Sequence, residues 1–173
     1  IFVIENFLSH QECDHYIEIT QDKVFEEAKI NMRGRQVMSK GIRNNDRLMI
    51  FDNNLAENLY ERVIEFLPQF HDNYKVSGFN EMFRIYKYSP GQQFKMHHDG
   101  SYIRNENEKS FYTFLIYLND DFEGGETEFD NLFTVAPKKG SALVFYHPLR
   151  HEGKTLISGQ KYVLRTDVMY LKT

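Results

Sequence analysis

The second half of the chain is a succession of short β-forming runs, and this pattern limits the possible folds more than any other sequence feature. From Gly78 onward, the runs MFRIYKY, SFYTFLIYLND, TEFDNLFTVA, SALVFYH and KYVLRTDVMY are separated by turn-forming segments such as SPGQQ, DDFEGG and PKKG. Helical patterns do not alternate with these runs, so a parallel α/β fold is disfavoured. The pattern predicts two sheets packed as a jelly roll.

The first 77 residues carry helical signals instead. Ser9 and Glu12 have the spacing of a capping box, which predicts a helix over residues 10–21. The segment LAENLYERVIEFL predicts a second helix over residues 55–67, because one apolar stripe recurs along it and Pro68 ends it. Residues 30–47 are polar and contain glycine, so they predict loop or edge structure. The expected stripe consists of Leu55, Leu59, Val63 and Phe66.

These signals together predict an α+β fold that is mainly β, with a double-stranded β-helix (jelly-roll) core and N-terminal supporting helices. A chain of 173 residues has the size of one domain and is long enough to bury a core. We therefore expect a single domain over residues 1–173. Residues 1–77 are expected to form the helical support and loop region, and residues 78–173 the jelly-roll core.

Composition excludes several classes of function. Acidic residues outnumber basic residues by 25 to 21, and no basic block is longer than two residues, so we expect no nucleic-acid partner. The apolar runs are too short to span a membrane. Cys13 is the only cysteine, which rules out an internal disulfide and a multi-thiolate zinc site and is typical of a reducing compartment. We expect a cytoplasmic protein, although a chain that begins at Ile1 leaves room for an upstream targeting segment.

The stretch FKMHHDGSY contains the strongest candidate for a metal site. On a strand, residues two apart point to the same side, so His97 and Asp99 are predicted to converge while His98 points away. Two histidines and one carboxylate form the facial triad that holds Fe(II) in non-haem oxygenases. Candidates for the second histidine are His147 and His151, which both follow the run SALVFYH. An H-x-D motif alone is weak evidence, since a surface pair of these residues is common.

In combination, four stretches resemble the prolyl 4-hydroxylase-like group of the iron(II)- and 2-oxoglutarate-dependent dioxygenases. They occur in the order that this family shows and cover about residues 81–170, whereas the N-terminal half resembles the family only loosely. The resemblance implies Fe(II), 2-oxoglutarate and O2 as cofactor and co-substrates, with ascorbate as a further candidate. The four stretches are RIYKYSPGQQFKMHHDGSY, FLIYLNDDFEGGETEF, VAPKKGSALVFYH and HEGKTLISGQK.

The resemblance also implies roles for individual residues. His97, Asp99 and His151 match the iron ligands, and Lys161 matches the basic residue that pairs with the distal carboxylate of 2-oxoglutarate. A cation is needed there, because an unpaired carboxylate in an interior site is costly. Lys161 follows His151 by ten residues, whereas His147 lies next to Pro148 and has no lysine ten residues after it. We therefore expect His147 to be structural or hydrogen-bonding.

Two tyrosines match family residues that line the co-substrate pocket. Tyr88 lies in the YSPG turn ahead of the metal strand, and Tyr117 lies in FLIYLND. Tyr117 is the expected hydrogen-bond donor to the distal carboxylate of 2-oxoglutarate. For each tyrosine the alternative is a core residue whose hydroxyl is bonded elsewhere.

The last β-forming run departs from the family pattern. By alternation, Lys161, Arg165 and Asp167 share one face of the run KYVLRTDVMY, where better-known members carry smaller or aromatic residues at the last two positions. Arg165 and Asp167 form either a buried ion pair that fixes the strand or a polar subsite. In the second case Arg165 anchors 2-oxoglutarate or a polar substrate group, and Asp167 contacts substrate. This departure counts against peptidyl proline as the substrate.

Five further residues carry expectations. Arg43 and Arg47 are substrate-contact candidates if residues 30–47 form a lid over the site, and are otherwise solvated. The pair Gly124 and Gly125 is expected to form a tight turn. Phe94 lies three residues before His97, so alternation places it on the opposite face, in the core.

The expected function is therefore hydroxylation of a C–H bond with succinate and CO2 as co-products. The first-choice substrate is a protein side chain, as in prolyl hydroxylases, and the alternative is a free amino acid or small metabolite. A cupin-like, metal-binding jelly roll without 2-oxoglutarate chemistry is the alternative from another class. No acid–base pair or nucleophile in the sequence suggests a different mechanism.

Overall fold

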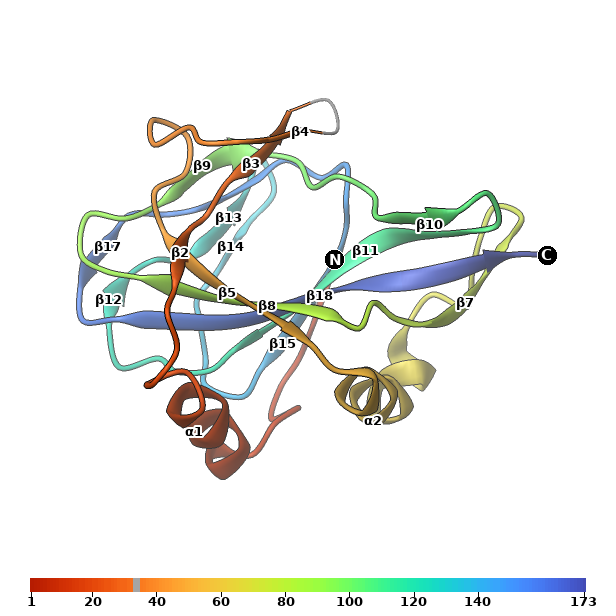
Figure 1. Ribbon diagram of the computed structural model, residues 1–173, viewed down its shortest axis with the longest axis horizontal. Helices are drawn as coiled ribbons and strands as arrows, with labels where there is room; N and C mark the ends of the chain where they lie inside the picture. The colour runs from red at the N-terminus through yellow and green to blue at the C-terminus, as the bar shows by residue number, and fades with distance from the viewer. Residues whose placement is uncertain (33–34) are drawn as a thin grey trace.

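A computed structural model of the protein describes residues 1–32 and 35–173, and it is mainly β with two α-helices (Figure 1). In chain order the elements are β1 Phe2–Ile4, α1 His10–Glu18, β2 Glu26–Glu27, β3 Ile30–Met32, β4 Arg35–Val37, β5 Asp46–Phe51, α2 Asn53–Val63, a 3-10 turn Ile64–Phe66, β6 Phe70–His71, β7 Tyr74–Phe79, β8 Met82–Tyr88, β9 Phe94–His97, β10 Ile103–Asn105, β11 Glu108–Tyr117, β12 Glu123–Gly124, β13 Thr127–Phe129, β14 Thr134–Val135, β15 Ala142–Tyr146, β16 His151–Gly153, β17 Leu156–Ser158 and β18 Lys161–Lys172.

Two facing sheets form the predicted jelly roll. The larger sheet has ten strands and includes the order β1-β15-β11-β18-β8-β5-β2, and the smaller sheet has the order β14-β13-β16-β9. Both helices lie against the larger sheet on the side away from β9 and β13 (Figure 1). The larger sheet is therefore buried on both faces, by the helices on one side and by the smaller sheet on the other.

Alternation along the central strands divides the interior into two apolar clusters. One cluster joins the helices to the larger sheet and includes Leu59, Phe83, Ile85 and Phe114. The other cluster lies between the two sheets and is rich in aromatic residues. Because neighbouring strand residues point to opposite faces, Ile85 supports the helices while Tyr86 faces the second sheet.

The capping box predicted for the first helix is confirmed. The Glu12 N–H donates to Ser9 Oγ at 3.2 Å, and the Ser9 N–H donates to Glu12 Oε2 at 2.7 Å. The helix ends at Glu18 rather than near residue 21. Thr20 explains this early end, because its hydroxyl donates to the Ile17 carbonyl at 2.7 Å and satisfies an acceptor that the next helical turn would otherwise bond.

The second helix begins at Asn53, with the Asp52 side chain accepting the Leu55 N–H as an N-cap. The predicted apolar stripe holds for Leu59 and Val63, which are buried, but is wrong for Phe66, which is 59% exposed. The chain tightens into a 3-10 turn after Val63. Because the 3-10 turn has a different period, it rotates Phe66 away from the core.

The first 77 residues contribute more β-structure than the sequence suggested. β1 pairs with β15, β5 pairs with β8 inside the larger sheet, and β7 begins at Tyr74. The segment 30–47 forms the edge hairpin β3–β4 and part of β5 around a turn, and its residues 33 and 34 lie outside the described residues. Within the described part of the chain, no helix is long and apolar enough to span a membrane.

Gly140 ties the N-terminal segment to the larger sheet. Its φ is +82°, its carbonyl accepts the Leu8 N–H at 3.0 Å, and a Cβ at this position would lie 2.3 Å from the Leu8 carbonyl oxygen. Only glycine fits such a backbone conformation and close approach without strain.

We therefore predict that Gly140→Ala lowers the free energy of unfolding by about 2 kcal/mol or more, because it combines an unfavourable φ with a backbone clash. Gly41→Ala is the matched control, since no atom lies within 4 Å of a Cβ there. Urea denaturation followed by circular dichroism measures both changes. Equal stability of the two variants would contradict the prediction.

Candidate metal centre

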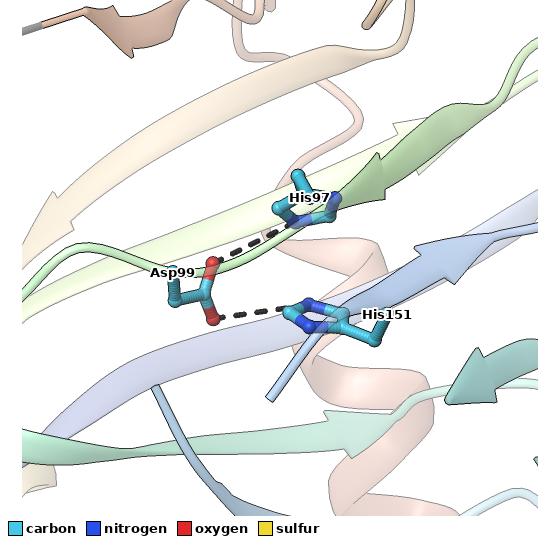
Figure 2. Close-up of side chains that lie close together, drawn as sticks. All are labelled: His97, Asp99 and His151. Atoms are coloured by element: carbon cyan, nitrogen blue, oxygen red, sulfur yellow. Dashed lines mark ion pairs between the residues drawn. The ribbon is translucent and has the colours of Figure 1, made fainter. Parts of the chain in front are cut away.

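The two histidines of the candidate centre come from adjacent strands of the smaller sheet. β9 and β16 pair antiparallel with His97 opposite His151. Asp99 follows two residues after the end of β9, and its N–H donates to the His147 carbonyl at 3.0 Å. As Figure 2 shows, all three side chains point toward one position, at the end of the strand pair where β9 ends and β16 begins.

The distances fit one metal ion. His97 Nε2 lies 3.7 Å from Asp99 Oδ1, and His151 Nε2 lies 3.9 Å from Asp99 Oδ2. One ligand atom from each of the three residues lies within 4.8 Å of the others, and this is the only such group of three among the residues described. The structure therefore brings together the three predicted ligands in the 2-His-1-carboxylate set that suits Fe(II).

Hydrogen bonds on the far side of each imidazole orient the free nitrogens. The Nδ1–H of His97 donates to the Lys95 carbonyl at 2.7 Å, and that of His151 donates to the Leu149 carbonyl at 2.9 Å. The proton is thus placed on Nδ1, and Nε2 keeps its lone pair for a metal. His97 Nε2 is buried and has no hydrogen-bond partner, which is the environment expected for a metal-binding atom.

Electrostatics keep these groups ready to bind. Burial lowers the pKa of His151 to about 4, against the opposing effect of Asp99, so the imidazole is neutral at physiological pH. Burial of Asp99 would raise the pKa of its carboxyl, but the Arg165 guanidinium and the two histidines outweigh it and hold the pKa well below its usual range. A neutral imidazole and an ionised carboxylate are the forms that bind metal.

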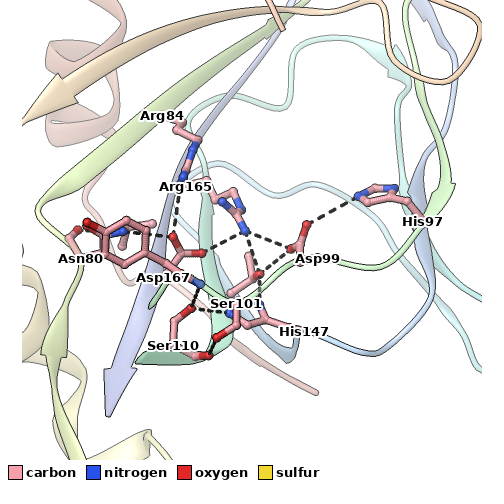
Figure 3. A network of polar contacts seen from close by, with 12 residues as sticks. Asn80, Arg84, His97, Asp99, Ser101, Ser110, His147, Arg165 and Asp167 are labelled. Carbon is pink, nitrogen blue, oxygen red and sulfur yellow. Dashed lines mark hydrogen bonds and ion pairs between the residues drawn. The ribbon is translucent and has the colours of Figure 1, made fainter. Parts of the chain in front are cut away.

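Two side chains contact Asp99 Oδ2, and Figure 3 shows one of them, Arg165, beside the carboxylate. The Thr113 hydroxyl donates to it, and Arg165 Nη2 lies 3.2 Å away. Thr113 Oγ1 also accepts from His147 Nδ1 at 3.0 Å, and His147 Nε2 accepts from the Ser110 hydroxyl at 2.9 Å. His147 is therefore a buried hydrogen-bonding residue, as expected, and it supports the carboxylate through Thr113.

Arg165 continues into a buried chain of charges. Its Nη2 lies 3.0 Å from Asp167 Oδ1, and Asp167 Oδ2 lies 3.3 Å from Arg84 Nη1. Asn80 Nδ2 donates to the same oxygen of Asp167 at 3.3 Å. The predicted ion pair between Arg165 and Asp167 is thus present, and it extends to the candidate metal ligand Asp99.

A cavity of about 630 Å³ lies between the two sheets and contains the candidate ligands. Its inner wall comes from alternate residues of β8, β18 and β11, which point away from the helices. Lys161, Tyr88, Tyr117 and Arg165, for which a co-substrate role is expected, all line this cavity. Asp167 is 1% exposed and lies behind this wall, so the predicted substrate role of Asp167 does not fit its position.

Lys161 is held between the two predicted tyrosines. Its Nζ lies 5.2 Å from the ring centre of Tyr88 and 5.5 Å from that of Tyr117, and it donates to the Gly125 carbonyl at 2.5 Å. Burial lowers the pKa of Lys161 to about 8. The Tyr117 hydroxyl is bonded to Thr127 Oγ1 at 2.8 Å, so it has a partner before any ligand binds.

Gly125 lies beside Lys161, and two arginines of the N-terminal segment line the cavity. Gly124 and Gly125 have φ values of +77° and +68°, and a Cβ on Gly125 would lie 3.2 Å from Lys161 Cδ, so the turn has no room for side chains. Arg43 and Arg47 line the cavity, as their candidate role requires. Arg47 also pairs with Glu26 at 2.8 Å.

The expectation for Phe94 is wrong. Its ring stacks on that of His97 with centroids 3.4 Å apart, and it lines the cavity instead of the core. The pairing of β9 and β16 is irregular here, because Phe94 lies opposite Gly153 while His97 lies opposite His151. Three steps along β9 thus match two along β16, and this bulge reverses the alternation on which the expectation rested.

Sequence reasoning did not single out Thr113 and Tyr86. Thr113 lies in the middle of β11 and is recognisable only when its contact with Asp99 is known. Tyr86 lines the cavity two residues before Tyr88, so alternation along β8 was a signal for it.

Comparisons with known proteins agree with this geometry. The profile of the 2OG-Fe(II) oxygenase superfamily matches residues 83–166, which include all three candidate ligands and Lys161. A protein of Acanthamoeba polyphaga mimivirus, provisionally named as a prolyl 4-hydroxylase, is 29% identical over 94% of this chain and 71% of its own length. Prolyl 4-hydroxylase 1 of Arabidopsis thaliana is 23% identical over 94% of this chain, which spans 66% of that relative.

Two solved structures share the fold over almost the whole chain. The viral collagen prolyl hydroxylase of Paramecium bursaria Chlorella virus-1, solved as a 2OG complex, has a TM-score of 0.72 and 23% identity, and the alignment covers 98% of this chain and 95% of that one. A Trichoplax adhaerens prolyl hydroxylase, solved with a hypoxia-inducible factor peptide fragment, has a TM-score of 0.77 and 20% identity, with 99% and 83% covered. Sequence profile, relatives and fold agree, and residues 83–166 of the chain match the 2OG-Fe(II) oxygenase superfamily.

Proposed function

We propose that this chain catalyses the 2-oxoglutarate-dependent hydroxylation of a C–H bond in a protein or peptide side chain, with proline as the first-choice target. The observation that carries the proposal is the convergence of His97, Asp99 and His151 at the cavity that Lys161 also lines. The presence of a buried cation in that cavity favours this chemistry over a cupin-like metal site, because a site without 2-oxoglutarate has no distal carboxylate for the cation to bind. Hydroxylation of a free amino acid uses the same machinery and is the second candidate.

The protein residues divide the work between them. His97 and His151 present their Nε2 lone pairs, and Asp99 presents Oδ1 while Oδ2 is held by Thr113 and Arg165. Three ligands on one side leave the other coordination positions open for co-substrate and oxygen. When bound, the Fe(II) centre supplies oxygen activation coupled to decarboxylation of 2-oxoglutarate, which yields succinate, CO2 and a hydroxylated product.

Lys161 is the proposed anchor for the distal carboxylate of 2-oxoglutarate, with Tyr117 as hydrogen-bond donor and Tyr88 as the wall beside it. Its only hydrogen bond among the described residues is to the Gly125 carbonyl, which leaves two ammonium protons for a carboxylate. Arg165 is less suited to this task, because its Nη2 is already committed to Asp99 and Asp167. The aromatic walls exclude water, which strengthens the ion pair.

The function is tested by succinate release with Fe(II), ascorbate and 2-oxoglutarate over a panel of proline-containing peptides and free amino acids. We predict that His151→Ala reduces succinate release to the background rate, because two remaining ligands do not hold the metal in a facial site. His10→Ala, an exposed histidine in α1, is the matched control and should keep full activity. Persistent activity in His151→Ala would contradict the assignment.

The affinity for 2-oxoglutarate should fall with rising pH above about 8. The free protein has a Lys161 pKa of about 8, and pairing with a carboxylate raises that pKa, so above pH 8 binding requires proton uptake and weakens by up to about tenfold per pH unit. Below pH 8 the affinity should be constant. Calorimetric titration of Fe(II)-loaded protein under nitrogen, from pH 6.5 to 9.5, measures this dependence.

Lys161→Arg separates this effect from other titrations, because a guanidinium stays charged throughout the range. The variant should show a flatter pH dependence, whereas the control Lys154→Arg, whose side chain lies outside the cavity and pairs with Glu128, should titrate like the unmodified protein. The same slope in Lys161→Arg and in the unmodified protein would argue against Lys161 as the anchor.

A further inference from the structure

The cavity is strongly cationic although the chain as a whole is acidic. Among the described residues that line it, seven are basic and one is acidic, in a chain with 21 basic and 25 acidic residues. Such separation of charge creates a positive potential that draws anions into a cleft. The basic residues are Lys29, Arg43, Arg47, Arg84, Arg150, Lys161 and Arg165.

Most of these charges are accounted for by partners or by the co-substrate. At the rim, Arg47 pairs with Glu26 at 2.8 Å and Arg150 with Asp130 at 2.9 Å. Deeper in, Arg84 and Arg165 share the buried carboxylates described above (Figure 3), and Lys161 is the proposed anchor of 2-oxoglutarate. The charges of Fe(II) and of doubly ionised 2-oxoglutarate cancel, so loading the site does not neutralise the remaining cations.

Arg43 is the buried cation without a counter-charge. It is 5% exposed, and no carboxylate of the described residues lies within 4 Å of its guanidinium nitrogens. Its Nε donates to Asn45 Oδ1 at 2.7 Å, whereas its Nη2 is buried without a hydrogen-bond partner. A buried charge in this state is costly unless an anion joins it.

The backbone holds Arg43 firmly beside the metal strand. Arg43 forms a β-bridge with Phe94, and the Lys95 N–H donates to the Ile42 carbonyl at 2.9 Å. The guanidinium carbon lies 4.2 Å from the ring centre of Tyr86 and 4.3 Å from that of Phe94. Because Phe94 in turn stacks on His97, one aromatic ring separates Arg43 from a candidate iron ligand.

The phenols beside Arg43 differ in their pKa values. Burial would raise the pKa of Tyr86, but the guanidinium groups of Arg43, Arg165 and Arg84 outweigh it and lower the pKa to about 8, whereas burial raises the pKa of Tyr88 to about 12. The case for an anion at this place therefore rests on the burial and missing partner of Arg43. The cavity volume of about 630 Å³ is within the range of roughly 300 to 1,000 Å³ typical of ligand sites, so a substrate group has room there.

We propose that Arg43 binds a carboxylate of the substrate, so that the hydroxylated carbon lies close to an acidic group. This inference rests on the proposed dioxygenase function and narrows its substrate class. The carboxylate has two sources, the side chain of an acidic residue next to the target residue in a peptide or the α-carboxylate of a free amino acid. A guanidinium binds either one through two parallel hydrogen bonds.

The test measures binding of matched probes, so that it does not depend on turnover. Fe(II)-loaded protein with saturating 2-oxoglutarate is titrated under nitrogen, in a calorimeter, with acetyl-Glu-Pro-amide against acetyl-Gln-Pro-amide and with L-proline against L-prolinamide. We expect the carboxylate member of at least one pair to bind at least tenfold more tightly than its amide. The pair that shows the preference identifies the source of the carboxylate.

Variants then assign the preference to one residue. Arg43→Gln should abolish the preference and leave the affinity for 2-oxoglutarate unchanged. Arg43→Lys should keep part of the preference, because an ammonium group keeps the charge but lacks the two parallel N–H donors of a guanidinium. Arg150→Gln removes the same charge from the exposed rim and should change the preference less than threefold. Circular dichroism establishes that each variant is folded, and the probe comparison in the unmodified protein stands even if Arg43→Gln does not fold.

Two results would overturn the inference. One is equal or undetectable binding of the carboxylate and amide members of both pairs to the unmodified protein. The other is a preference that survives in folded Arg43→Gln, or that Arg150→Gln reduces equally. Failure of the unmodified protein to bind 2-oxoglutarate, measured in the same samples, would instead contradict the proposed function.

Discussion

The antiparallel pairing of β9 with β16 is the contact on which the candidate centre depends. It places His97 opposite His151, and the backbone carbonyls of Lys95 and Leu149 then fix the imidazole tautomers. The same pairing contains the bulge that moves Phe94 into the cavity. Because of this extra strand residue, Phe94 lines the same cavity as His97 and supplies the ring on which the Arg43 guanidinium rests.

The charges behind the centre form a single compensated unit. Basic and acidic side chains alternate along it, and each one contacts the next. Their order is Arg84, Asp167, Arg165 and Asp99. Alternation of this kind lets four ionised groups remain buried, because each desolvated charge has an opposite neighbour. The arrangement also raises the pKa of Arg165, so the guanidinium stays charged while it holds one oxygen of the candidate ligand Asp99.

Sequence reasoning predicted the parts of the fold and site that depend on local patterns. The jelly-roll class followed from the short β-forming runs, the first cap from Ser9 and Glu12, and the convergence of His97 with Asp99 from their spacing. Features set by pairing between distant strands did not follow. The bulge at Phe94 and the contact between Thr113 and Asp99 have no local signature, because both depend on which residues lie opposite one another across a sheet. The place of β5 within the larger sheet was missed for the same reason, because it depends on the pairing of β5 with β8.

Strand β18 extends from Lys161 to Lys172 and takes part in nearly every layer of the molecule. It pairs with β8, β7 and β11, carries Lys161 and Arg165 on the cavity side, and buries Leu164, Val168 and Tyr170 against the helices. Because the same strand completes both the apolar core and the ligand-facing wall, a form of the protein in which β18 is unpaired has neither. Binding competence should thus appear only together with global folding, and a partly folded form that can still capture 2-oxoglutarate is not expected.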